Sequence, residues 1–154
     1  MNDALDGVQS FLVSKLNAAL VVIETAKSIT IPRLEAVDTA PILSRVFPQM
    51  EILPEVTDTL YRDDEGPLDF EAFDVHTVTL LLSITGSDVK AVEYNLTYYR
   101  LAIMRIIKAD NTFGGLFNRV RLGQSKYWPA AQNEAAKQFL QTLRQTLLVR
   151  VLQT

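Results

Sequence analysis

Hydrophobic residues recur at helical spacing in two separate stretches of the chain. Near the amino terminus, apolar positions three and four residues apart predict an amphipathic helix over residues 4–20, with Asp3 as its N-cap. A second stripe of the same period predicts a helix over residues 87–109, capped by Ser87. This stripe consists of Val92, Leu96, Tyr99, Ile103, Ile106 and Ile107.

Alternation and β-branched residues predict strands elsewhere. A strand-like stretch over residues 50–56 is interrupted by Pro54, which favours the edge of a sheet. Residues 70–84 are rich in Val, Thr and Leu and predict a long strand whose centre is covered on both faces. Residues 116–122 predict a third strand, which could reach Trp128.

Three segments are less regular. Residues 24–47 predict an irregular connector, in which Pro41 could open a short helical turn. Residues 129–136 are expected to be a connection with one helical turn at most. Residues 139–152 fit a helix or a strand, and their Thr and Val content favours a strand.

The order of these elements predicts an α+β fold in a single domain over residues 1–154. An N-terminal helix, a β-hairpin, a second helix and two closing strands would form one mainly antiparallel four-stranded sheet, with the helices on one face. The sheet and its helix would occupy residues 48–152. A length of 154 residues suits one domain, and 48% hydrophobic residues suffice for a core.

Composition and charge narrow the possible partners. The formal net charge is −3, which gives no general attraction to nucleic acid or anionic membranes. Cysteine is absent, so disulfides and thiolate chemistry are excluded. No apolar run reaches the about 18 residues of a membrane span, and Asp3 makes the start acidic, unlike a signal peptide. We expect a soluble intracellular product.

No pattern typical of an active site occurs, so we expect a protein that is not an enzyme. His76 is the one histidine, and no serine lies in a Gly-x-Ser-x-Gly elbow. One histidine and no cysteine make a zinc site improbable, and the acidic run around Asp63 lacks the EF-hand order of ligands. Gly114-Gly115 lacks the P-loop lysine and is expected to allow positive φ in a turn. We therefore expect no catalytic residue, cofactor or metal.

Three clusters are candidates for a subunit or partner interface. Their members are Asp63, Asp64, Glu65, Tyr94, Tyr98, Arg119 and Arg121. The acids lie in a polar run ending in Gly66-Pro67, which predicts an exposed loop, solvated or turned toward a partner or channel. The tyrosines fit the core or a subunit interface. If the two arginines shared a face with Arg144 and Arg150, a basic strip could meet nucleic acid or an acidic subunit.

The chain resembles the tail terminator proteins of tailed bacteriophages. Tyr98-Tyr99-Arg100 begins a helical stretch that is followed by a turn, Asp110–Leu116, and a strand over residues 118–122. A helix, a short glycine-containing turn and a strand in this style recur in that family. The order of N-terminal helix, connector, hairpin with an acidic tip, Tyr-rich helix and closing strands extends the resemblance over nearly the whole chain.

This resemblance implies a structural virion protein without catalytic residues. Such proteins form a homo-oligomeric ring, commonly a hexamer, that caps the tail tube at full length and presents the head-joining surface. The implied partners are the tail tube protein on one face and a neck or stopper protein on the other. DNA would pass through the ring without specific binding, and no membrane is involved. The implied location is the head-proximal end of the virion tail, after synthesis in the host bacterial cytoplasm.

Two other classes of function stay open. One is another head–tail component, such as a neck connector or tail completion protein, which would differ in ring size and partner. The other is a small-molecule-binding or nucleic-acid-binding α+β domain. A deep pocket near His76 or the acidic cluster would favour the former, and salt-dependent DNA binding through Arg119 and Arg121 the latter.

Overall fold

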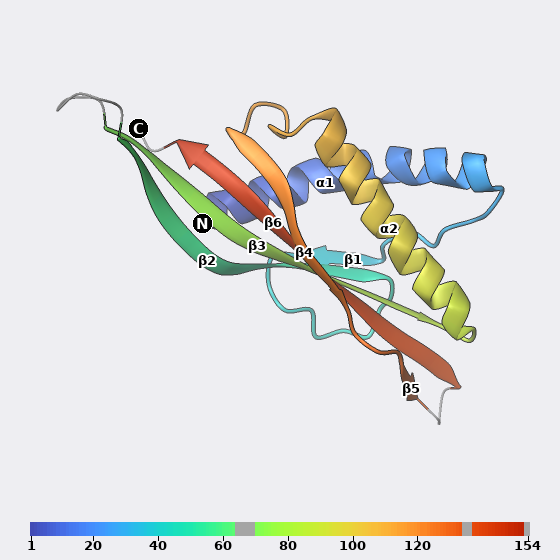
Figure 1. Ribbon diagram of the computed structural model, residues 1–154. Helices are drawn as coiled ribbons and strands as arrows, with labels where there is room; N and C mark the ends of the chain where they lie inside the picture. Colours follow the sequence, from blue (N-terminus) through green and yellow to red (C-terminus); the bar gives the residue numbers. More distant parts are fainter. Residues whose placement is uncertain (64–69, 134–136, 153–154) are drawn as a thin grey trace.

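The computed structural model describes residues 1–63, 70–133 and 137–152 of the chain. Within these ranges the protein has an α+β fold, with two helices on one side of a six-stranded mixed sheet (Figure 1). The helices are α1 (Asn2–Lys27) and α2 (Val89–Ala109). The strands are β1 (Ala36–Asp38), β2 (Gln49–Asp63), β3 (Phe70–Gly86), β4 (Arg119–Tyr127), β5 (Ala131–Asn133) and β6 (Gln138–Leu152).

The sheet is larger than the predicted four-stranded one. Its order is β1-β2-β3-β6-β4, with β5 paired to β6. The four long strands pair antiparallel, but β1 pairs parallel with β2, which makes the sheet mixed. The two additional strands, β1 and β5, have three residues each, so they are too short to produce an alternating pattern in the sequence.

Helix α1 confirms the first predicted helix but is longer at its carboxyl end. It continues past residue 20 to Lys27, and Ser28 follows in the left-handed conformation that often ends a helix. The N-cap is Met1, so the prediction of Asp3 as the cap is wrong. Asp3 lies inside the first turn of the helix. Ile23, which continues the apolar spacing beyond residue 20, is buried in this added turn.

Among the described residues, α1 is the one helix that is long and apolar enough to cross a membrane, judged by length and composition alone. Core helices of other proteins meet the same criterion. A stripe of α1 is packed in the hydrophobic core against the sheet and α2: Ala4, Leu5, Val8, Leu12, Leu16, Leu20 and Ile23. Core packing therefore accounts for this stripe of the helix.

Helix α2 confirms the second predicted helix. All six residues of the predicted stripe are buried. The N-cap is Asp88 and not Ser87, since the Asp88 carboxylate accepts a hydrogen bond from the Lys90 backbone N–H at 3.0 Å. The helix ends at Ala109, as predicted.

Strands β3 and β6 form the centre of the sheet. The predicted long strand over residues 70–84 is confirmed as β3, and the preference for a strand over residues 139–152 is confirmed as β6. Their helix-facing side chains meet in the core, as in the pairs Val78–Leu147 and Leu82–Leu143. This face of the sheet supplies the platform on which both helices pack.

The segments between these elements required several corrections. The connector over residues 24–47 begins inside α1 and contains β1, and no helical turn forms after Pro41. Part of the connection over residues 129–136 is strand β5. The loop predicted from Arg62 begins later, because β2 continues to Asp63, and residues 64–69 lie outside the described ranges.

Two strands depart from regular pairing. β2 carries an irregularity between Pro54 and Val56, on a stretch whose outer edge has no strand partner in the described part of the chain, which agrees with the predicted edge. β4 begins at Arg119, three residues later than predicted, and reaches Tyr127 through a bulge between Leu122 and Ser125. The residues before Arg119 belong to the turn.

The packing of α1 gives the first test. Leu12→Ala should lower the free energy of unfolding by about 2–5 kcal/mol, because Leu12 is fully buried and its loss leaves a cavity. Val13→Ala should change it by about 0.5 kcal/mol or less, because Val13 is 48% exposed. Urea denaturation of both variants measures the difference. Equal effects would contradict the packing of α1 described above.

Candidate interaction surfaces

The sheet face opposite the helices is largely open. Figure 1 places both helices on one side, and the connector before β2 on the other side at one end. At the centre of the open face, Glu55 joins three strands. Its carboxylate accepts from the Thr79 hydroxyl at 2.6 Å and from the Arg144 guanidinium at 2.5 Å. This ion pair is exposed to solvent, so it fixes side-chain positions more than it stabilises the fold.

The structure brings the predicted arginines together on this open face. Arg119 lies directly opposite Arg150 in the β4–β6 pair, and Arg121 follows two residues along β4. The three line a cavity of about 220 Å³ whose remaining walls are Leu60, Val75 and Leu148. The Arg150 guanidinium lies 3.8 Å from the Phe73 ring centre, a cation–π contact. Arg144 lies farther along β6 and is paired with Glu55.

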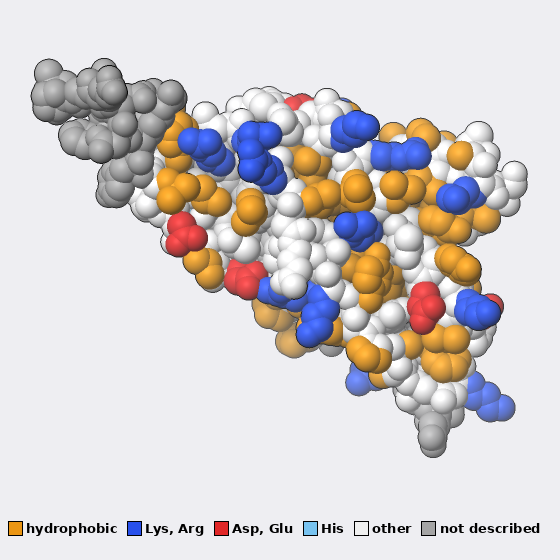
Figure 2. All heavy atoms as spheres, in the orientation of Figure 1, with side chains coloured by type: hydrophobic (Ala, Val, Ile, Leu, Met, Phe, Trp, Pro, Cys, Tyr) orange, Lys and Arg blue, Asp and Glu red, His pale blue; other side chains and the backbone are white. Residues whose placement is uncertain are grey.

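A second basic surface lies on the helix side of β4. A groove of about 740 Å³ runs between α2 and β4, and we refer to it as the α2–β4 groove. Its apolar lining comprises Leu101, Met104, Ile107, Val120 and Leu122, and its charged lining comprises Arg105, Lys108, Arg119 and Arg121. On the face seen in Figure 2, basic side chains stand beside hydrophobic ones. Because Arg119 and Arg121 line both cavities, positive charge surrounds the β4 edge of the sheet.

The turn before β4 positions these arginines. The Asp110 carboxylate accepts from the Thr112 N–H and hydroxyl and from the Gly114 N–H, at 2.7–3.0 Å, and the Thr112 bonds lower the pKa of Asp110. Gly114 and Gly115 have φ of 71° and 85°, which confirms the predicted positive φ. The Val120 N–H donates to the Asn111 carbonyl at 2.7 Å, which fixes the first residues of β4.

The two tyrosines divide between the core and the surface. Tyr98 is half-buried against the core, and the Lys27 ammonium lies 5.9 Å from its ring centre. Tyr94 is 59% exposed, and its ring stacks on Tyr98 with centroids 6.3 Å apart. Tyr99 is fully buried and donates its hydroxyl to the Pro32 carbonyl, and burial raises its pKa above the usual range. Tyr94 thus presents an aromatic ring to solvent.

The acidic cluster cannot be placed beside the arginines. Asp64 and Glu65 lie outside the described residues, and Asp63 is described only as the last residue of β2. By strand order, β2 and β4 are separated by β3 and β6. The strand that leads into the acidic run and the arginine-bearing strand therefore occupy different positions across the sheet.

His76 lies on the helix-facing side of β3. Its exposure is 7%, and its Nδ1 lies 2.8 Å from the Thr57 hydroxyl. Burial lowers the pKa of His76 below its usual 6.5, and the α-ammonium of Met1 acts in the same direction, while Asp74 opposes both. The carboxylate of Asp74 accepts from the Thr59 hydroxyl at 2.9 Å. This environment favours the neutral form of the imidazole.

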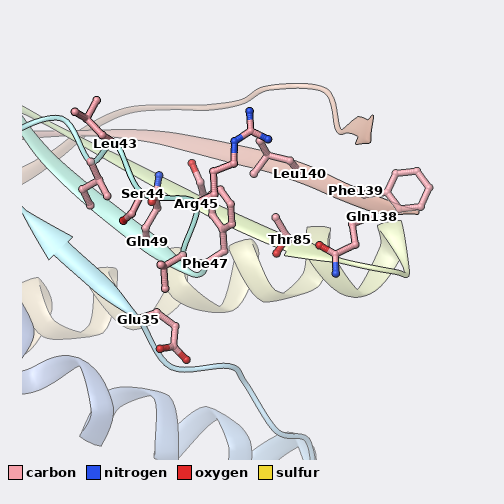
Figure 3. Close-up of a pocket in the computed structure, with 13 residues that line it drawn as sticks. Glu35, Leu43, Ser44, Arg45, Phe47, Gln49, Thr85, Gln138, Phe139 and Leu140 are labelled. Carbon is pink, nitrogen blue, oxygen red and sulfur yellow. The ribbon is translucent and has the colours of Figure 1, made fainter. Parts of the chain in front are cut away.

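A cavity of about 820 Å³ lies between the connector and the ends of β3 and β6 (Figure 3). The Gln49 amide, with its NH₂ toward the connector, lies 3.2 Å from the carbonyl oxygens of Ser44 and Val46. Ser83 on its floor is hydrogen-bonded to the Thr142 hydroxyl at 2.8 Å and has no basic partner among the described side chains. Within the described ranges, no group of three potential metal ligands occurs.

Two groups of residues in these surfaces were not predicted. Arg105 and Lys108 were not among the predicted interface residues, because their place opposite β4 depends on how α2 packs. The sequence around Glu55 indicates only a possible strand edge, through the neighbouring Pro54. The contacts of Glu55 on the open face depend on the local bulge and on Arg144, which is distant in sequence. Such pairings leave no local pattern.

The chain was compared with known proteins. No protein-family model matches it. No curated protein matches it either. Among solved structures, a chain from "Virion of native gene transfer agent (GTA) particle" aligns with 89% of this chain and 92% of that chain, at 13% identity and a TM-score of 0.29. At that TM-score the likeness carries no argument about function.

The buried histidine predicts a pH dependence. Because the folded chain holds the His76 proton more weakly than the unfolded chain does, its contribution to stability is present above pH 6.5 and falls as pH falls below it. His76→Gln should lose less stability than the parent between about pH 7.5 and pH 5.5. Urea midpoints at both pH values measure this. The carboxylates are common to both proteins, so an identical loss would show that His76 is not the cause.

Proposed function

We propose that this chain is a virion structural protein that acts as a tail terminator. In this proposal it forms a homo-oligomeric ring that caps the tail tube and offers the head-joining surface to a neck or stopper protein. The protein is not an enzyme and needs no cofactor. The sequence resemblance over the helix, turn and strand of residues 98–122 supports the family, and the α+β fold is compatible with it.

The observation that carries the proposal is the presence of separate exposed apolar surfaces. One lies on α1, where the adjacent Val21 and Val22 are 50% and 55% exposed. Another lies on the sheet, where Val56 and Leu60 are 48% and 52% exposed. A subunit of a cyclic ring contacts its two neighbours through unlike surfaces, so it needs two such regions.

The predicted interface residues have roles in this ring. Arg119 and Arg121 border the apolar cavity on the open sheet face and would contact an acidic neighbour. Asp63, Asp64 and Glu65 would contact a neighbour or face the channel, where carboxylates repel DNA and prevent it from sticking. Tyr94 offers the type of exposed aromatic side chain that is enriched at interfaces.

A second candidate function, nucleic-acid binding, is favoured by one observation. Arg119, Arg121 and Arg150 form a basic strip beside one another. The net charge of −3 and the apolar residues among these arginines favour a protein partner over a phosphate backbone. DNA binding that weakens steeply with salt would support the second candidate.

Particle mass tests the ring proposal directly. Light scattering over a range of concentrations, with and without isolated tail tubes, should reveal a closed species of about six subunits, and negative-stain images should show rings. About twelve subunits would indicate a neck connector. A monomer at every concentration, with and without tubes, would contradict the ring.

The exposed face of α1 gives a mutational test of the same proposal. Val21→Ser/Val22→Ser should weaken ring assembly by removing exposed apolar area, while its stability stays close to that of the parent. Asn17→Ser/Ala18→Ser is the matched control, because it adds two serines at exposed positions of the same helix without removing a large apolar side chain. Assembly that is equally strong in both variants would exclude this face from the interface.

A further inference from the structure

The α2–β4 groove has the chemistry of a receptor for an acidic segment. Its four cations, Arg105, Lys108, Arg119 and Arg121, are all exposed, and none forms an ion pair with a described carboxylate. The described residues that line the groove include no Asp or Glu. Charges of one sign concentrated in a concave surface attract a ligand of the opposite sign.

The floor of the groove indicates a protein ligand. Apolar side chains from α2 and β4, including Met104 and Leu122, lie between the cations. A phosphate backbone would leave this apolar surface without a partner, whereas a peptide with both acidic and apolar side chains would match both parts of the lining. The groove also runs along the outer edge of β4, which has no strand partner among the described residues.

The chain itself contains a segment with the complementary chemistry. Residues 63–71 read Asp-Asp-Glu-Gly-Pro-Leu-Asp-Phe-Glu, with five carboxylates, no Lys or Arg, and the apolar residues Pro67, Leu68 and Phe70. This segment runs from the last residue of β2 to the first two residues of β3, and β6 lies between β3 and the groove-forming β4 in the sheet. Unlike surfaces at different positions across a subunit are what a head-to-tail ring requires.

We infer that the α2–β4 groove binds the acidic segment, residues 63–71, of a second copy of this chain. The inference rests on the proposed ring and deepens it, because it assigns one contact surface on each side of a subunit joint. Carboxylates of the segment would meet Arg105 and Lys108 on α2 and the two arginines on β4, and its apolar residues would cover the groove floor. Exposed charges at the rim make the association weaken as salt rises.

Charge reversal with complementation tests this inference. Arg105→Glu/Lys108→Glu reverses the helix wall of the groove, and Asp63→Lys/Asp64→Lys/Glu65→Lys reverses the segment. Each variant alone should self-associate about tenfold or more weakly than the parent in light scattering. The equimolar mixture should recover assembly, because every joint then pairs opposite charges. Lys90→Glu/Arg45→Glu, which replaces two cations by carboxylates at exposed sites outside the groove and so matches the charge change of the groove variant, should assemble like the parent.

Folding of the variants is checked by thermal melting. Lys108 lies in the last turn of α2, where a carboxylate opposes the helix dipole. Arg105→Glu/Lys108→Gln avoids this effect and keeps the test valid if the first variant fails to fold.

The outcomes separate the groove from the ring. If the parent assembles and the groove variants assemble equally well, the inference is overturned and the ring proposal stands. Assembly that is lost in both reversed variants but not restored in the mixture also overturns it. If the groove variants lose salt-dependent DNA binding and keep assembly, the groove serves nucleic acid. If the parent never assembles, with or without tail tubes, the ring and the inference fall together.

Discussion

The antiparallel pairing of β3 with β6 is the constraint on which the rest of the structure depends. The two strands pair continuously from Phe73–Leu152 to Gly86–Phe139, although they are far apart in sequence. Side chains on one face of this pair, such as Val78 and Leu147, are fully buried beneath the helices. Because side chains alternate between faces, the same register places Val75, Leu148 and Arg150 on the open face. One pairing therefore sets both the core and the candidate interface.

The position of the last strand, β6, explains why the β2 side and the β4 side of the sheet differ. Since β6 inserts between β3 and β4, the chain cannot close its sheet into consecutive hairpins, and β4 is left on the side of the sheet away from β2. The Asp110 turn then brings β4 down beside the carboxyl-terminal half of α2. Cations from two elements, Arg105 on the helix and Arg121 on the strand, are thereby gathered in one groove.

Local patterns predicted those parts of the fold whose periodicity is strong. The stripe of α2, including Leu96 and Ile103, and the β-branched run of β3 each identify an element, because burial on one or both faces leaves a regular signature. The three-residue β1, the bulge at Glu55 and the groove between α2 and β4 depend on residues far apart in sequence. Single-sequence reasoning named Arg119 and Arg121 as candidate interface residues but could not place Arg105 beside them.

A net charge of −3 conceals a strong asymmetry of charge along this chain. Residues 63–71 concentrate five carboxylates, whereas the described lining of the α2–β4 groove is cationic. Average composition argues against general attraction to polyanions, yet it permits attraction between unlike regions of two identical chains. Such contacts are directional, since the acidic region of one subunit cannot pair with that of another. Between identical subunits, a directional contact that repeats produces a ring if its rotation closes and a filament if it does not. The geometry of the joint, more than its affinity, would therefore determine whether copies of this chain close into a ring or continue as a filament.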